Sequence, residues 1–260
     1  MAKPMSQNPN AKRVRRAAAL YDIHANLPAV EAVLEELRRE HVDEIIIGGD
    51  VLPGPMPKQT LDCLRDLRLP TQFIYGNGEV AILEVMCGKD PSAVPEAYRP
   101  IIRWNAQQLS ASEEQFLASW PKTVTVDVAG LGEVLFCHAT PRNENECFIR
   151  STPEERLRTI FAGLNMAVCG HTHMQFDRMI GNTRVVNAGS VGMPFGKPGA
   201  DWLLLGPDIE LRHTEYDLAK AAERIRATSY PQAEEFAVHS VQQPPTEDAM
   251  LVVFARAELK

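Results

Sequence analysis

Side chains that can bind metal ions recur at five separated points of this 260-residue chain. An aspartate and a histidine stand at positions i and i+2 in Asp22-Ile23-His24, where an extended strand would point both to one side. The other four groups also follow predicted strands: Gly48-Gly49-Asp50, Gly76-Asn77, His138 and Gly170-His171-Thr172-His173. Carboxylate, amide and imidazole donors in this mixture suit two divalent ions of borderline hardness better than Ca²⁺ or Mg²⁺.

A pair of such ions has a characteristic chemistry. Two ions about 3.5–4 Å apart can share a bridging hydroxide and stabilise the attacking and leaving oxygens of a phosphoryl displacement. Any one of these histidines, taken alone, would be read as an ordinary strand-end residue. Five groups in order, each after a predicted strand, favour a shared metal centre that hydrolyses a phosphate ester.

These groups need a scaffold that brings distant parts of the chain together. Strand-like and helical stretches alternate in the first half: strand Ala17–Leu20, helix Leu27–Arg39, strand Glu44–Gly48, helix Pro57–Leu67 and strand Gln72–Tyr75. This rhythm predicts an α/β fold with parallel strands and right-handed crossovers. In an open α/β sheet the ligand site lies off the carboxyl ends of the strands, so the groups would meet there.

The second half favours antiparallel pairing. Three hairpins are expected: Thr123–Val128 with Glu133–Cys137, Met174–Ile180 with Thr183–Asn187, and Trp202–Leu205 with Ile209–Tyr216. A strand at Ala167–Cys169 and helices at Pro153–Leu164 and Leu218–Thr228 complete this half. Gln232–Val241 is expected to be a surface helix, and Met250–Ala255 is an apolar run that could pack on the domain or join a partner.

The domain boundaries follow from these patterns. We predict a disordered tail over residues 1–12, a single domain over 13–240 and a C-terminal extension over 241–260. Residues 79–120 are predicted to form a helical insert beside the cleft. The insert carries Trp104 and Trp120, which are expected to pack within it, although one of them could line a nucleobase pocket.

Composition narrows the classes of protein. Hydrophobic residues make up 45% and charged residues 23%, which excludes a wholly disordered chain. The net charge of -7 argues against broad electrostatic binding to nucleic acid or to anionic membranes. Five cysteines without a CxxC pair argue against a disulfide framework, and a cytoplasmic location is expected. No apolar stretch approaches the length of a membrane span. Assembly into a homo-oligomer is compatible with the sequence.

The ordered motifs D-x-H, G-D, G-N, H and G-H-x-H resemble those of the calcineurin-like metallophosphoesterase superfamily. The resemblance covers about residues 15–216, and Gly181–Gly192 is similar to the smaller bacterial and archaeal phosphodiesterase branch. It implies a four-layered α/β/β/α sandwich. It also implies two divalent ions, Mn²⁺, Fe²⁺, Zn²⁺ or Ni²⁺ with manganese favoured, and attack on phosphorus by a metal-bound hydroxide.

The resemblance also assigns roles to individual residues. It implies that a first metal is held by Asp22, His24 and His173, a second by Asn77, His138 and His171, and that Asp50 bridges both. Asp50, Asn77 and His138 would also take part in catalysis. On the loop after His138, Arg142 could bind a phosphate through two hydrogen bonds together with Asn143, or it could be an ordinary solvated arginine.

Two departures from the family pattern bear on the reaction. Many relatives that hydrolyse monoesters have a histidine after G-N that protonates the leaving oxygen, and this chain has Gly78. Introducing a histidine at Gly78 is expected to supply that proton if the turn lets it enter the cleft. Glu79 follows and is expected to begin a helix rather than to act in catalysis. Tyr21 and Ala25 replace smaller residues and would narrow the mouth of the site.

The leading interpretation is a dinuclear phosphoesterase acting on a small phosphate ester or nucleotide, with diesters favoured over monoesters. One alternative is a phosphomonoesterase for a small phosphate or nucleotide, with a proton donor from outside the motifs. Another is a non-catalytic scaffold that keeps the fold and the metals.

Overall fold

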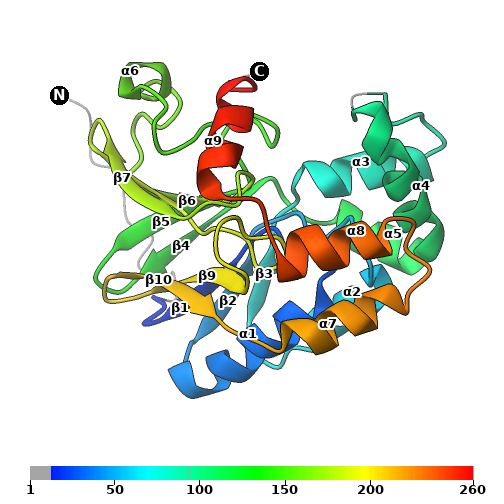
Figure 1. Ribbon diagram of the computed structural model, residues 1–260. Coiled ribbons are helices and arrows are strands. Elements are labelled where there is room, and N and C mark those ends of the chain that lie inside the picture. Colours follow the sequence, from blue (N-terminus) through cyan, green and yellow to red (C-terminus); the bar gives the residue numbers. More distant parts are fainter. Residues whose placement is uncertain (1–12, 93, 260) are drawn as a thin grey trace.

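The computed structural model describes residues 13–92 and 94–259 (Figure 1). Two five-stranded sheets pack face to face, and helices lie on their outer sides. This arrangement confirms the predicted α/β sandwich. The predicted tail over residues 1–12 lies outside the described residues.

The first sheet has the order β10-β9-β1-β2-β3. Its strands are β1 (Ala17–Leu20), β2 (Glu44–Ile47), β3 (Thr71–Phe73), β9 (Ala200–Leu205) and β10 (Ile209–Thr214). β1, β2 and β3 run parallel, as the strand–helix rhythm predicts, and β9 joins β1 in the antiparallel direction. The carboxyl ends of three parallel strands therefore meet at one edge, beside the loops that carry the first three motifs.

The second sheet has the order β4-β5-β6-β8-β7. Its strands are β4 (Thr123–Val128), β5 (Gly132–Cys137), β6 (Met166–Cys169), β7 (Phe176–Ile180) and β8 (Thr183–Asn187). The β4–β5, β7–β8 and β9–β10 hairpins confirm the predicted antiparallel pairing. β5, β6 and β8 run parallel, so His138 and the Gly170–His173 motif leave this sheet at the same edge.

Helices occur in both halves of the chain. Those before residue 120 are α1 (Leu27–Glu40), α2 (Pro57–Arg65), α3 (Asn77–Met86), the 3-10 turn η1 (Glu96–Tyr98), α4 (Arg99–Gln108) and α5 (Ala111–Ala118). Those after it are α6 (Glu154–Leu157), α7 (Leu218–Arg226), α8 (Ala233–Phe236), the π-helical turn η2 (Ala237–Gln242) and α9 (Glu247–Ala255). Among the described residues, no helix has both the length and the apolar character that a membrane crossing needs.

Alternation along β1 shows why the sandwich is layered. Ala17 and Ala19 face the second sheet, in a core that includes Phe136 and Val168. Ala18 and Leu20 face the opposite way, into a core shared with α1. The outer face of the second sheet is covered by a third cluster around Phe148, Leu157 and Phe161. The small side chains of β1 allow both neighbouring layers to approach closely, which overrides their helix propensity.

One helix prediction was wrong in part. The helix expected over Pro153–Leu164 ends at Leu157. Beyond it the Thr183 hydroxyl donates to the carbonyls of Phe161 and Leu164, and Gly163 adopts a φ of 83°. These tertiary contacts could not be read from the local pattern.

The stretch Gln232–Val241 is a surface helix, as expected. Glu234, Glu235 and His239 are exposed, whereas Phe236 and Val241 are buried in a core shared with α7.

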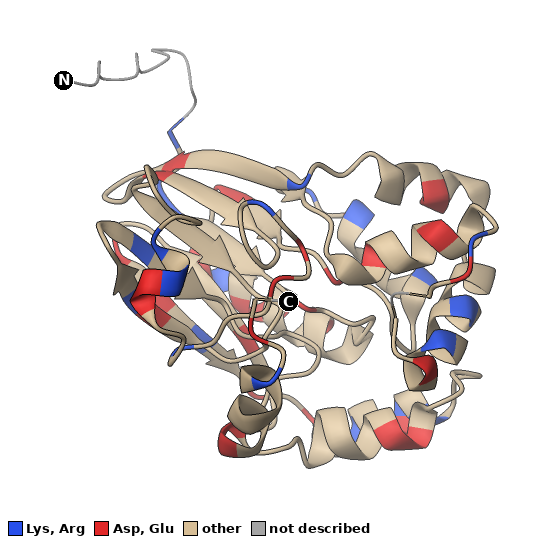
Figure 2. Cartoon of the chain, turned by 90° about the horizontal axis from the view of Figure 1, so that it is seen from above, with Lys and Arg blue, Asp and Glu red and all other residues tan. Residues whose placement is uncertain are grey.

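Charge is mixed over the surface. Lys and Arg residues are interspersed with Asp and Glu residues in the view of Figure 2. The five cysteines are free thiols.

Candidate metal centre

The first motif does not use strand alternation to bring its side chains together. β1 ends at Leu20, and Asp22 and His24 have φ angles of 50° and 47°, in the left-handed region. The expectation of an extended Asp22-Ile23-His24 segment was therefore wrong, although both side chains do reach the same place. The loop is fixed instead by backbone hydrogen bonds, from Asp22 N–H to the Gly49 carbonyl and from His24 N–H to the Asp50 carbonyl.

Left-handed backbone is concentrated at this site. Five of the eight non-glycine residues with positive φ in the described chain are candidate ligands: Asp22, His24, Asp50, His171 and His173. Aspartate and histidine tolerate this conformation better than branched residues, yet it still costs free energy. The strained residues are those whose donor atoms point into one space.

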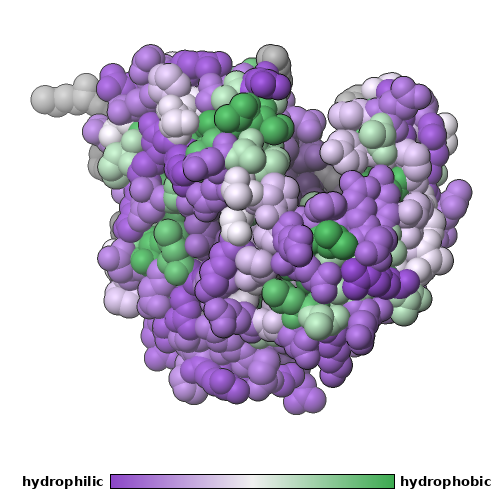
Figure 3. Space-filling view, viewed as in Figure 1, coloured by the Kyte–Doolittle hydropathy of each residue, from purple (hydrophilic) through white to green (hydrophobic). Residues whose placement is uncertain are grey.

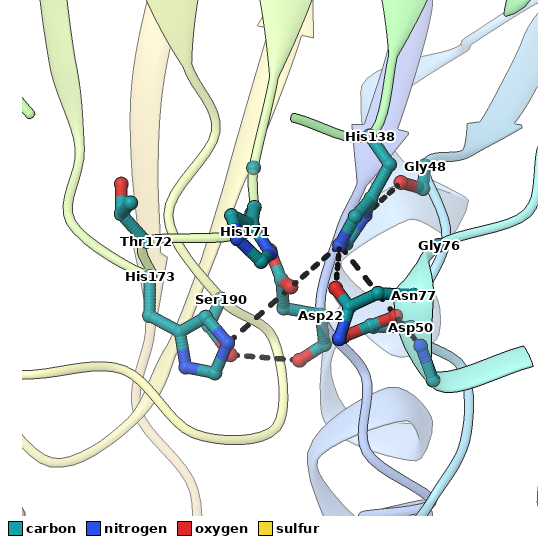
Figure 4. Close-up of polar contacts among 12 residues, drawn as sticks. Asp22, Gly48, Asp50, Gly76, Asn77, His138, His171, Thr172, His173 and Ser190 are labelled. Carbon is teal, nitrogen blue, oxygen red and sulfur yellow. Dashed lines mark hydrogen bonds and ion pairs between the residues drawn. The ribbon is translucent and has the colours of Figure 1, made fainter. Parts of the chain in front are cut away.

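Three of the histidines have the same tautomer imposed on them. Nδ1 of His24, His138 and His173 lies 3.2, 3.0 and 2.9 Å from a backbone carbonyl oxygen. A carbonyl oxygen can only accept, so each Nδ1 carries the hydrogen. In the neutral ring Nε2 then holds a lone pair, and Nε2 of His138 and of His173 faces the centre (Figure 4). Nε2 of His24 lies beside that of His173.

The first group of donors consists of Asp22, His24 and His173, whose ligand atoms all lie within 4.8 Å of one another. Nε2 of His24 and Nε2 of His173 are 3.1 Å apart, so their lone pairs point at each other. Asp22 Oδ2 accepts the His171 N–H. Oδ1 is buried and accepts no hydrogen bond; it lies 3.3 Å from His173 Nε2, which carries no hydrogen in the neutral ring. Two facing lone pairs and an orphaned carboxylate oxygen fit a cation and do not fit a neutral hydrogen-bond network.

The second group consists of Asp50, His138 and His171, again within 4.8 Å of one another. Asn77 joins it through Oδ1, which lies 3.1 Å from His138 Nε2. Asp50 Oδ1 is 3.5 Å from His138 Nε2, and Asp50 Oδ2 is 4.0 Å from His24 Nε2. One carboxylate thus turns an oxygen toward each group, which is the position a bridging ligand needs.

The electrostatics favour positive charge at this place. Burial disfavours the Asp50 carboxylate, but the His138 imidazole outweighs burial and lowers the Asp50 pKa below its ordinary value. Burial also disfavours a charged His138, but Asp50 outweighs it and raises the His138 pKa to about 10. Burial and then His138 lower the pKa of His171 to about 4. His171 is therefore held neutral, as a metal ligand must be, whereas His138 holds a proton that a cation bound at its Nε2 would replace.

Glu79 contributes more to the site than its position in the sequence indicates. It lies in the first turn of α3, as expected, but its fully buried carboxylate accepts three backbone N–H groups. Oε2 accepts from Asp50 at 2.8 Å and from Gly76 at 2.8 Å, and Oε1 accepts from Leu52 at 2.9 Å. Burial and then the Asp50 charge raise the Glu79 pKa to about 7. Glu79 ties the loop after β2 to the loop after β3; the only signal in the sequence was a glutamate three residues after the helix cap.

Gly78 is required by packing. A Cβ built at this position would lie 2.0 Å from the Leu52 carbonyl oxygen. The Gly78 N–H donates to Asp50 Oδ1 at 2.7 Å. The condition set for a histidine at Gly78, that the turn lets it enter the cleft, is therefore not met, because the side chain would displace the loop that carries Asp50.

Tyr21 does not narrow the mouth of the site. It is fully buried, and its hydroxyl donates to the Val168 carbonyl at 3.1 Å. Its ring covers the motif glycines, since a Cβ at Gly48 or Gly170 would lie 2.1 or 2.6 Å from ring carbons. Tyr21 therefore spans the two sheets beneath the site.

Arg142 and Asn143 lie on the loop after His138, where they were expected. The Arg142 guanidinium is already paired with Glu146, at 2.5 Å from Nη2 and 2.9 Å from Nε. The Asn143 side-chain oxygen accepts the Asn145 N–H at 2.6 Å. Both side chains thus have partners within their own loop.

Comparison with known proteins was consistent with this geometry. A sequence model of the calcineurin-like phosphoesterase superfamily domain matches residues 16–206. An uncharacterised protein of Methanocaldococcus jannaschii is 27% identical over 236 residues, covering 83% of this chain and 93% of that protein.

Two solved structures are similar in fold. A hypothetical protein from Pyrococcus horikoshii has a TM-score of 0.74 at 19% identity and covers 89% of this chain and 99% of its own. A metallophosphoesterase from Sphaerobacter thermophilus has a TM-score of 0.69 at 24% identity and covers 88% of this chain and 100% of its own. At these identities the structures establish the architecture alone.

Proposed function

The chain belongs to the calcineurin-like phosphoesterase superfamily, and we propose that it is a dinuclear metal-dependent phosphodiesterase acting on a small phosphate ester. The first ion would be held by Asp22, His24 and His173, and the second by Asn77, His138 and His171, with Asp50 between them. The observation that carries this proposal is the position of Asp50, with one oxygen toward each group of donors.

When bound, divalent ions at these positions supply Lewis acidity and activate water for attack on phosphorus. The protein's own contribution is positioning. The histidine Nδ1–H groups hold each ring against a backbone carbonyl, and Glu79 holds the two loops that carry Asp50 and Asn77. Preorganised donors of this kind cost no reorganisation during the reaction.

The preference for diesters rests on Gly78. The position after Asn77 has no room for a side chain, so the leaving oxygen has no proton donor from that turn. A missing general acid costs roughly 10²–10⁴-fold, and the cost is greatest for poor leaving groups. Esters with acidic leaving groups are therefore the favoured substrates, and alkyl monoesters are the least favoured.

The donor set accepts several metals, of which manganese is our first choice because imidazole and carboxylate ligands are both present. Arg142 and Asn143 stay a prediction for substrate binding, and substrate would have to compete with Glu146 for the guanidinium. A cytoplasmic location also stays a prediction.

The test is a phosphoesterase panel with added Mn²⁺. We expect bis-p-nitrophenyl phosphate to be hydrolysed readily and glycerol phosphate slowly, with Asp50→Asn as the matched inactive control. A flat dependence on leaving-group pKa, with fast alkyl monoester hydrolysis, would establish the monoesterase alternative. Binding of two metal ions without turnover of any ester would establish the scaffold alternative.

A further inference from the structure

A cavity lies beside α3, the helix that begins at Asn77. Its volume is ≈ 300 Å³, at the lower end of the range for ligand pockets, and its floor is apolar. Tyr75, Val80, Leu83 and Trp120 line it, and the charged side chains of Glu84 and Lys89 also border it. None of these residues belongs to the metal centre.

The aromatic wall of this cavity is held rigidly. Trp120 is only 5% exposed and stacks on Phe73 with ring centroids 5.0 Å apart and an interplanar angle of 23°. Phe116 packs edge-on against the same indole at 5.3 Å. This packing fixes the base of the cavity, so no side chain there must be ordered when a ligand binds.

Residues that line the cavity adjoin two of the segments that carry ligands of the second group, those of Asn77 and His138. Tyr75 precedes Asn77 by two residues, and Val80 follows it by one turn of α3. On the other side, the Tyr75 N–H donates to the Pro121 carbonyl at 3.1 Å. The adjoining Lys122 donates to the Arg142 carbonyl at 3.2 Å, on the loop after His138.

From this placement we infer that the cavity binds an aromatic ring of the substrate. The ring is carried by the ester oxygen that is not the leaving group. The inference rests on the proposed function and names its substrate class: diesters with one aryl or nucleobase-bearing substituent. A phosphate held near Asn77 and His138 would let such a substituent lie along α3, with its ring against Tyr75, Val80 and Leu83.

The first experiment compares two diesters with the same leaving group. Phenyl p-nitrophenyl phosphate and methyl p-nitrophenyl phosphate both release p-nitrophenolate, so a difference in KM reports the other substituent. In the Mn²⁺-loaded wild type we expect KM to be about tenfold lower for the phenyl ester, since burying a ring contributes at least that factor. Equal KM values would overturn the inference.

The second experiment fills the cavity. Val80→Trp should raise KM for the phenyl ester about tenfold and leave the methyl ester unchanged. Gln107→Trp, which places an indole on an exposed position of α4, is the matched control and should change neither value. Equal effects of Val80→Trp on both esters would show damage to the metal centre rather than loss of a ring site. If circular dichroism shows that Val80→Trp is unfolded, Leu83→Phe replaces it.

A binding measurement separates this inference from the proposed function. Calorimetry on the metal-loaded protein should give tighter binding of phenylphosphonate than of methylphosphonate, and Val80→Trp should abolish the difference. If neither diester is hydrolysed but this difference is present, the proposed function fails and the ring site stands. If both diesters are hydrolysed and the phosphonates bind equally, the ring site fails and the proposed function stands.

Discussion

Two acidic regions of the described chain differ in what their side chains contact. One is the metal centre. The other is a surface groove of ≈ 520 Å³ between α1 and β10, which is lined by Glu36, Glu40, Arg212 and Thr214. In the groove, Arg212 Nη2 lies 2.5 Å from Glu36 and 2.6 Å from Glu40, and the Thr214 hydroxyl donates to Glu36 at 2.5 Å.

The two places differ in whether their hydrogen-bond acceptors already have donors from the protein. Each of these contacts in the groove pairs an acceptor with a donor of the protein, and Glu36 and Arg212 are about a quarter exposed. At the metal centre Asp22 Oδ1 has no donor, and the Nε2 atoms of His24 and His173 face each other. Cavity size and charge density would select the groove as a site, whereas the unmatched acceptors select the metal centre.

The largest effect should come from the bridging position. Asp50→Asn replaces a charged oxygen by an amide, so neither group of donors keeps its shared carboxylate. We expect activity to fall about 10³-fold or more and metal content to fall by two equivalents. Turnover of an aryl diester and elemental analysis after dialysis measure both effects. Glu36→Gln in the groove should leave both unchanged; a variant Asp50→Asn that retains both metals would break the comparison.

The two groups of donors should be separable. His173→Ala removes a donor from the first group and His171→Ala removes one from the second. Each variant is expected to lose about one equivalent of metal and roughly 10²–10³-fold in activity. Each serves as the control for the other, with metal content measured on the same samples. Loss of both ions from either variant would mean that the donors act as one site.

Glu79 should act on the centre without being a ligand. In Glu79→Gln one acceptor oxygen becomes a donor that faces a backbone N–H. We expect about 1–3 kcal/mol of lost stability and about 10–100-fold lower metal affinity. Denaturant unfolding and metal titration provide the two readouts.

The matched control is Glu113→Gln. Glu113 is also buried and also accepts an N–H, from Ser110, at the start of its helix, but it pairs with Lys58 away from the centre. It should lose stability and keep its metal affinity. Equal losses of metal affinity in both variants would reduce Glu79 to a purely structural role.

The sequence predicted the parts of this architecture that depend on local pattern. Ile45-Ile46-Ile47 identified a strand buried on both faces, and the motif order placed seven polar side chains near one edge. The function of Glu79 could not be predicted in this way, because its three donors come from two loops that meet only in the fold. The same holds for Gly78, whose constraint is a carbonyl of Leu52 that lies distant in sequence.

The C-terminal extension shows a second limit of sequence patterns. Apolar side chains gather over α9 in Figure 3, and Val252 and Val253 are 56% and 52% exposed. Phe254 nevertheless contacts Phe195, which stacks on His173 with ring centroids 5.2 Å apart. The apolar run Met250–Ala255 therefore did not indicate that Phe254 contacts Phe195, the ring that packs on the candidate ligand His173.

The smallest effect is expected in the groove. Arg212→Ala should lower the free energy of unfolding by about 1 kcal/mol at pH 7 and leave activity and metal content unchanged, since the pairs are partly solvated.

Burial disfavours the Glu36 carboxylate, but Thr214 and Arg212 outweigh burial and hold its pKa below the ordinary value of 4.5. A depressed pKa contributes stability that is present above the unfolded value and is lost as pH falls through the folded value. The difference between wild type and Arg212→Ala should therefore be constant near neutral pH and shrink below pH 4.5. Urea unfolding at pH 7 and at lower pH measures it, and a difference that stays constant on acidification would show that Arg212 acts through its packing on Trp202 rather than through Glu36.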